Sequence, residues 1–168
     1  MRPHLSMSRR TRRTPFSSRV EAAGASGYTV YNHTLLATSF RGIEVDYWHL
    51  CENVQVWDVS CEKQVTLMGP GANELAQYMT PRDLSQAKVG RCYYLPMCDE
   101  NGKMMNDAVA IKVNDRHWRL SVADSDVLLW AKGLAIGFGL DVEVREPNIY
   151  PVAVQGPKAE ELMCRVFG

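Results

Sequence analysis

The carboxylate of Asp107 occupies an unusual position for an acidic side chain. Residues 99–109 read DENGKMMNDAV, and the first four have the composition of a hairpin turn. Asp107 comes five residues after this turn, directly before the apolar run 108–111, where strand propensity disfavours an acid. Two interpretations stay open: Asp107 lies on a solvent-facing side of the strand together with Met105 and Val109, or this face lines a pocket. A partly desolvated carboxylate in a pocket can orient a bound nitrogen base or accept its proton.

Aromatic side chains are the second chemical theme. Tyr93 and Tyr94 lie on the strand expected to pair with the strand of Asp107. Aromatic residues usually fill cores, but they also stack on flat heterocycles and attract cationic methyl donors. Other familiar signatures are absent, because the chain contains no GxxxxGK[ST], GxGxxG, HExxH or GxSxG motif. The chemistry therefore depends on one acid and its aromatic neighbours.

The cysteines give no sign of a metal centre. They are odd in number, form no CxxC pair and have no histidine at ligand spacing: Cys51, Cys61, Cys92, Cys98 and Cys164. This pattern favours reduced thiols in a cytoplasmic protein and argues against a disulfide framework or a zinc site. We therefore expect no metal ion.

The elements that must position Asp107 form a predicted antiparallel meander. Strands are expected over residues 91–97, 103–113 and 117–123, joined by tight turns. A second pattern is an internal echo, GPGANEL at 69–75 and GPKAEEL at 156–162, each following an apolar strand and opening a helix. The echo predicts two related strand–helix units packed on a sheet, as in ferredoxin-like α+β folds.

Charge divides the chain unevenly. The formal net charge of the 168 residues is zero, but residues 1–20 hold six of the 19 basic residues and no acid, so 13 bases face 19 acids in the remainder. That balance gives no support to nucleic-acid binding, and no apolar run is long enough to cross a membrane. We expect a basic N-terminal arm over residues 1–27, in which an organelle transit peptide is the less favoured alternative. The chain ends directly after the second Gly-Pro helix, so we expect residues 28–168 to be the N-terminal part of a longer domain.

Four stretches occur in an order that resembles the aminomethyltransferase (glycine-cleavage T-protein) superfamily: VWDVSCEKQVTLMGPGANELAQYMT, VGRCYYLPMCDENGKMMNDAVAIKV, HWRLSVADSD and PVAVQGPKAEELMCRVFG. The resemblance runs from about Tyr28 to the end of the chain. Further stretches, among them SRRTRRTPFSSRV, SGYTVYNH and SVADSDVLLWAKGLA, are similar to its dimethylsulfoniopropionate demethylase branch. The glycine-cleavage branch tends to carry Asp-Asp in the hairpin, where this chain has Asn106-Asp107.

The resemblance implies the N-terminal part of a three-domain, cloverleaf-like α+β fold that binds tetrahydrofolate in a central channel. It also implies that N5 of tetrahydrofolate takes a methyl group from the sulfonium of dimethylsulfoniopropionate, giving 5-methyltetrahydrofolate and 3-methylthiopropionate. A sulfonium is an activated leaving group, so no metal or redox cofactor is expected and positioning carries most of the catalysis. The implied partners are folate, the sulfonium zwitterion and the remainder of the fold beyond residue 168, without nucleic acid or membrane.

By the same resemblance, Asp107 is the catalytic carboxylate that also binds the folate, Tyr94 contacts the folate, and Val109 lines its pocket. Ala123 and Asp124 fall at further cofactor-binding positions. Two alternatives stay open: an aminomethyltransferase of the glycine-cleavage type, and a non-enzymatic folate-binding scaffold of the same superfamily.

Overall fold

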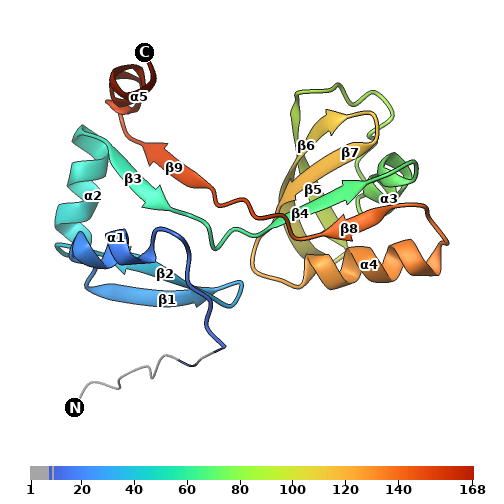
Figure 1. Ribbon diagram of the computed structural model, residues 1–168, viewed down its shortest axis with the longest axis horizontal. Coiled ribbons are helices and arrows are strands. Elements are labelled where there is room, and N and C mark those ends of the chain that lie inside the picture. Colours follow the sequence, from blue (N-terminus) through green and yellow to red (C-terminus); the bar gives the residue numbers. More distant parts are fainter. Residues whose placement is uncertain (1–7, 9) are drawn as a thin grey trace. The chain divides into compact units, whose positions relative to one another are not determined.

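The computed structural model describes residue 8 and residues 10–168 (Figure 1). The chain divides into two compact units that differ in their continuity. Unit 1 combines the residues up to Cys61 with Tyr150–Gly168, whereas unit 2 is the continuous segment Glu62–Ile149. Both units mix helices with antiparallel strands, as the α+β prediction requires.

Unit 2 contains a five-stranded antiparallel sheet in the order β5-β6-β7-β4-β8. Its strands are β4 (Gln64–Met68), β5 (Cys92–Cys98), β6 (Met104–Asn114), β7 (His117–Ser121) and β8 (Glu143–Arg145). The predicted meander is confirmed as β5-β6-β7, because alternating side chains and two tight turns favour adjacent antiparallel strands.

One face of this sheet packs on the helices α3 (Ala72–Tyr78) and α4 (Val127–Gly137) (Figure 1). Leu67, Leu95 and Trp118 are among the strand residues of this core, and each is at most 1% exposed. The Trp118 indole also donates a hydrogen bond of 2.7 Å from Nε1 to Oδ1 of Asn73. Without the edge strand β5, the connectivity β4–α3–β6–β7–α4–β8 and the order β6-β7-β4-β8 are those of a split βαβ arrangement.

Unit 1 is built from shorter pieces. Its elements are α1 (Ser17–Ala22), β1 (Gly27–Tyr31), β2 (Thr34–Ser39), α2 (Ile43–Glu52), β3 (Gln55–Asp58), β9 (Val152–Gln155) and α5 (Ala159–Phe167). β1 pairs with β2 and β3 pairs with β9, in two separate antiparallel pairs. Neither α2 nor α5 has a buried residue in the described part of the chain. These two helices therefore lack the close packing that buries residues of α3 and α4, whereas α1 buries Ser17.

The echoed Gly-Pro turns are local repeats in different units. Gly69 directly follows β4 and Gly156 directly follows β9, with φ of +132° and +123°. A Cβ atom would lie 2.7 Å from the carbonyl oxygen of Asp141 at Gly69, and 2.3 Å from that of Asn53 at Gly156. Both turns thus require glycine for backbone conformation and for close approach. The expectation that the two copies pack on one sheet is wrong, because β4 and β9 pair with different partners.

The expected N-terminal arm, residues 1–27, includes residues 1–7 and 9, which lie outside the described residues. The helix α1 falls within this segment. Among the described residues, no helix combines the length and apolar character needed to cross a membrane.

Candidate functional site

The sheet face of unit 2 that turns away from α3 and α4 carries three of the predicted site residues. Alternation along β6 buries Asn106, Ala108 and Ala110, so Asp107 and Val109 project from the other face. Tyr94 on β5 pairs directly with Val109 and stands on the same face. We call Tyr94, Asp107 and Val109 the open-face cluster.

The open-face cluster is accessible within the described chain. Tyr94 is 48% exposed and Val109 47%, and Asp107 is also exposed. Met105, two residues before Asp107 on the same strand, is exposed as well. Asp107 and Val109 therefore share an exposed face, whereas Met105 lies at a bulge opposite Met97 and Cys98 and lines a small hollow with Met97, Asn106 and Val127. A carboxylate beside exposed apolar and aromatic groups can bind the polar edge of a flat ligand, while the rings of that ligand stack on the aromatic side chain.

Ala123 is brought to this cluster by a side chain from the opposite face of β6. The Asn106 amide donates from Nδ2 to the carbonyl oxygen of Ala123 at 3.0 Å and to Oγ of Ser125 at 2.7 Å. Its Oδ1 accepts from the Ala123 N–H at 3.3 Å. The β6–β7 register pairs Val109 with Ser121, so Ala123 continues that line toward Asp107. Asp124 follows in the exposed turn.

Two basic side chains stand on the same sheet face on β7, and nothing in the sequence assigned them to the site. The side chains of His117 and Arg119 alternate with buried Trp118 and Leu120. Nε2 of His117 and Nε of Arg119 are buried without a hydrogen-bond partner. Burial, followed by the charges of Arg119 and Arg145, lowers the pKa of His117. The alternation in HWRLS is the sequence signal that places the side chains of His117 and Arg119 on this face.

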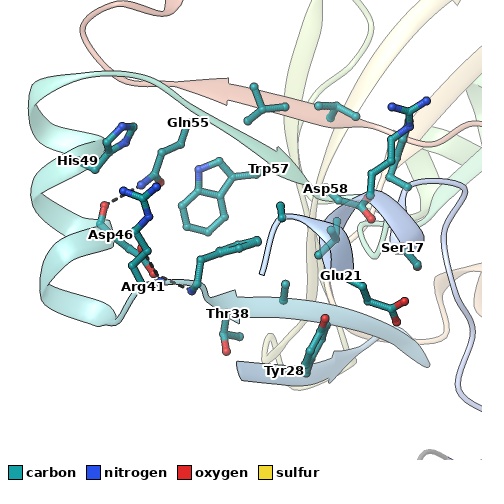
Figure 2. Close-up of a pocket in the computed structure, with 18 of the residues that line it drawn as sticks. Ser17, Glu21, Tyr28, Thr38, Arg41, Asp46, His49, Gln55, Trp57 and Asp58 are labelled. Atoms are coloured by element: carbon teal, nitrogen blue, oxygen red, sulfur yellow. Dashed lines mark hydrogen bonds between the residues drawn. The ribbon is translucent and has the colours of Figure 1, made fainter. Parts of the chain in front are cut away.

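A separate cavity of about 560 Å³ lies in unit 1 (Figure 2). Its lining comes from α1, β1, β2, α2, β3 and Val152 of β9, and includes Phe16, Val20, Leu35, Val45, Val56 and Trp57. The Trp57 indole points into this space, and its Nε1 is buried without a hydrogen-bond partner. No sequence motif indicated this cavity, because its lining segments are distant in the sequence.

Asp46 is an acid of this cavity with a local structural role. Its carboxylate accepts hydrogen bonds from the backbone N–H groups of Phe40, at 2.8 Å, and Arg41, at 3.2 Å. The bond from Phe40 is the main reason that the pKa of Asp46 lies below its usual value. Gln55 donates from Nε2 to the backbone oxygen of Asp46 at 2.7 Å, which ties α2 to β3. Asp46 thus holds the β2–α2 connection.

The described residues contain no group of three or more His, Cys, Asp or Glu side chains placed to hold a metal ion. The five cysteines form no disulfide, and three of them, Cys51, Cys92 and Cys164, are exposed.

Comparison with known proteins places this geometry in context. Residues 16–168 match the family described as the GCVT N-terminal domain. The dimethylsulfoniopropionate demethylase of Ruegeria pomeroyi is 54% identical over 161 residues, covering 96% of this chain and 44% of that protein. An aminomethyltransferase of Deinococcus deserti is 28% identical over 90% of this chain and 43% of its own length. The chain therefore spans less than half the length of these relatives.

A solved structure has the same fold. The glycine cleavage system aminomethyltransferase T of Bartonella henselae superposes with a TM-score of 0.82 at 21% identity. The match covers 92% of this chain and 43% of that one.

Proposed function

The chain belongs to the family of the GCVT N-terminal domain, and on that premise we propose that it supplies part of the active site of a tetrahydrofolate-dependent methyltransferase. The substrate is dimethylsulfoniopropionate, and the products are 5-methyltetrahydrofolate and 3-methylthiopropionate. The observation that carries this proposal is the open-face cluster, in which Asp107 lies beside Tyr94 and Val109. The sulfonium donor is favoured by the 54% identity to the Ruegeria pomeroyi demethylase.

The open-face cluster suits the folate side of this reaction. The exposed Tyr94 ring and the Val109 side chain offer apolar surface to the flat pterin. The Asp107 carboxylate accepts hydrogen bonds from ring N–H groups and so orients N5. As the N5–CH₃ bond forms, the S–CH₃ bond breaks, its electron pair stays on sulfur, and the N5 proton passes to Asp107 or water. Positioning of N5 in line with the methyl group supplies most of the rate.

We propose that the rest of the fold packs in the unit 1 cavity. The occupant is polypeptide equivalent to the part of the relatives that lies beyond the matched region. Three observations support this occupant: the apolar lining, the unpartnered donor Trp57 Nε1, and the absence of buried residues in α2 and α5. A strand or loop backbone carbonyl would satisfy the indole, and apolar side chains would fill the remaining volume.

The first experiment tests the reaction. The chain is mixed with the polypeptide that follows the matched region in the Ruegeria pomeroyi demethylase, then incubated with tetrahydrofolate and dimethylsulfoniopropionate. We expect 3-methylthiopropionate and 5-methyltetrahydrofolate in equal amounts. Transfer of a methylene from an aminomethyl-lipoyl protein, with no sulfonium demethylation, would replace the proposal with the glycine-cleavage reaction. Folate binding without either reaction would favour the scaffold alternative.

The second experiment tests the occupant of the cavity. Hydrogen exchange of residues 54–57 is compared with and without the added polypeptide, and we expect slower exchange when it is present. Val56→Asp places a charge in the cavity lining and should abolish the complex. Leu129→Asp is the matched control, since Leu129 is 65% exposed and lies outside the cavity. Equal loss in both variants, or protection that arises only from self-association, would exclude this occupant.

A further inference from the structure

Asn106 lies next to Asp107 in sequence but on the other face of β6, and it is only 4% exposed. Its side chain makes three hydrogen bonds, and all three reach the segment 123–125. Both the N–H and the carbonyl oxygen of Ala123 are engaged by the one amide. The strand pairing of β6 with β7 reaches only to Val109 and Ser121, so the Asn106 amide extends the connection between the two chain segments.

The chemistry of this contact requires an amide. The Ala123 carbonyl oxygen needs a donor and the Ala123 N–H needs an acceptor, and asparagine supplies both from one planar group. A carboxylate of the same shape accepts but cannot donate, so it would face the Ala123 carbonyl oxygen with a repelling oxygen. A protonated carboxyl regains one donor.

We propose that Asn106 is a positioning residue, an amide clamp that holds the Ala123–Ser125 segment beside Asp107 and thereby shapes one edge of the folate site. The proposal rests on the proposed function, because the segment forms an edge of a folate site only if the open-face cluster binds folate. The clamp acts through the segment and does not itself touch the ligand, since its side chain lies on the buried face of β6. The same segment leads into α4, whose first turn includes the N–H of Val127 bonded to the Ser125 carbonyl oxygen at 3.0 Å.

A control with a similar two-way amide contact exists within the same unit, at the exposed Asn73. Asn73 also uses its amide in both directions: Nδ2 donates to the Asp115 carbonyl oxygen at 2.9 Å, and Oδ1 accepts from Trp118 at 2.7 Å. The substitution Asn73→Asp removes the same kind of donor away from the segment 123–125. It reports what a loss of general stability does to the site.

The test compares Asn106→Asp with Asn73→Asp in the 168-residue chain. Amide exchange of Ala123 is followed by NMR, and tetrahydrofolate binding is followed by titration, at neutral pH and in mild acid. For Asn106→Asp at neutral pH we expect Ala123 exchange at least about tenfold faster and tetrahydrofolate affinity about tenfold weaker. Relative to the unaltered chain at the same pH, both should recover partly in acid, because the buried carboxyl then carries a proton. Asn73→Asp should leave both readouts near those of the unaltered chain.

Unchanged Ala123 exchange in Asn106→Asp would overturn the clamp while leaving the proposed function intact. Equal effects of the two substitutions on Ala123 would also overturn it, because Asn106 would then act only through stability. If the unaltered chain does not bind tetrahydrofolate, the proposed folate site is rejected for the isolated chain. The exchange of the Ala123 amide in the two variants, compared with the unaltered chain at each pH, then tests the clamp alone.

Discussion

Tyr94 lies directly opposite Val109 across strands β5 and β6, and both side chains stand on the sheet face that carries Asp107. Neither the tyrosine nor the valine is covered by α3 or α4, whose packing buries the other face of the sheet. Large apolar side chains exposed on a sheet face are most readily explained by something that stacks on them.

Removing the charge of Asp107 should affect turnover and leave the fold intact. Asp107→Asn keeps the shape of the side chain on an exposed position but removes its ability to take a proton, so we expect turnover about tenfold to a hundredfold lower. The measurement is 3-methylthiopropionate formation in the complemented protein. Glu100→Gln in the neighbouring turn is the control, since Glu100 is exposed and its carboxylate accepts a hydrogen bond from the side chain of the adjacent Asn101. Unchanged turnover in Asp107→Asn would make Asp107 an ordinary surface acid.

The ring of Tyr94 should matter more than its hydroxyl. Tyr94→Ala removes the stacking surface, so we expect tetrahydrofolate affinity about tenfold weaker. Tyr94→Phe keeps the ring and should bind within about threefold of the unaltered chain. Arg82 donates to the backbone oxygen of Tyr94, a contact that both substitutions preserve. A strong loss in Tyr94→Phe would instead assign the affinity to the hydroxyl.

The two Gly-Pro turns should resist substitution in both units. Gly69→Ala and Gly156→Ala place a Cβ against a backbone carbonyl oxygen in a left-handed conformation, so each should cost roughly 1–3 kcal/mol of stability. Gly133→Ala is the control, because a Cβ there meets nothing within 4 Å on the helix α4. That control should be neutral or stabilising by up to about 1 kcal/mol. Thermal unfolding measures all three, and equal melting temperatures would contradict the steric argument.

His117 should make the stability of unit 2 fall in mild acid. Its pKa in the folded chain lies below the ordinary value of 6.5, mainly because of burial. The unfolded chain therefore takes up a proton more readily as the pH falls below that value, which favours unfolding. Between about pH 7.5 and about pH 5.5, His117→Gln should lose less stability than the unaltered chain. Parallel stability curves would show that His117 titrates normally.

The sequence allowed the meander to be predicted because its determinants are local. The DENG turn and the apolar run after it predict the strand, but they do not predict its two faces, because Asn106 is buried and Val109 is exposed. The likeness to a known family then pointed to Tyr94, Asp107 and Val109, and the strand register brings them onto one face. How these residues act on a ligand stays a prediction.

Long-range pairing could not be predicted in the same way. Strand β3 pairs with β9, so Val56 lies opposite Val154, although the whole of unit 2 separates them in the sequence. No local pattern encodes that partner. The echo of GPGANEL and GPKAEEL was visible, but it specifies a turn and does not specify the sheet that each strand joins. The role of Asn106 was hidden for a similar reason, since its partners lie on a later segment.

The insertion of unit 2 between β3 and β9 has a consequence for the order of folding. During synthesis β3 leaves the ribosome long before β9, so its partner is missing while unit 2 emerges as a continuous segment. The first and last strands of unit 2, β4 and β8, are hydrogen-bonded neighbours, with Thr66 opposite Arg145. Folding of unit 2 pairs β4 with β8 and so closes the long loop between β3 and β9. The entropy cost of closing this loop is then already met when β3 and β9 pair. Substitutions that weaken the β4–β8 pair should therefore slow the assembly of unit 1, which contains neither strand.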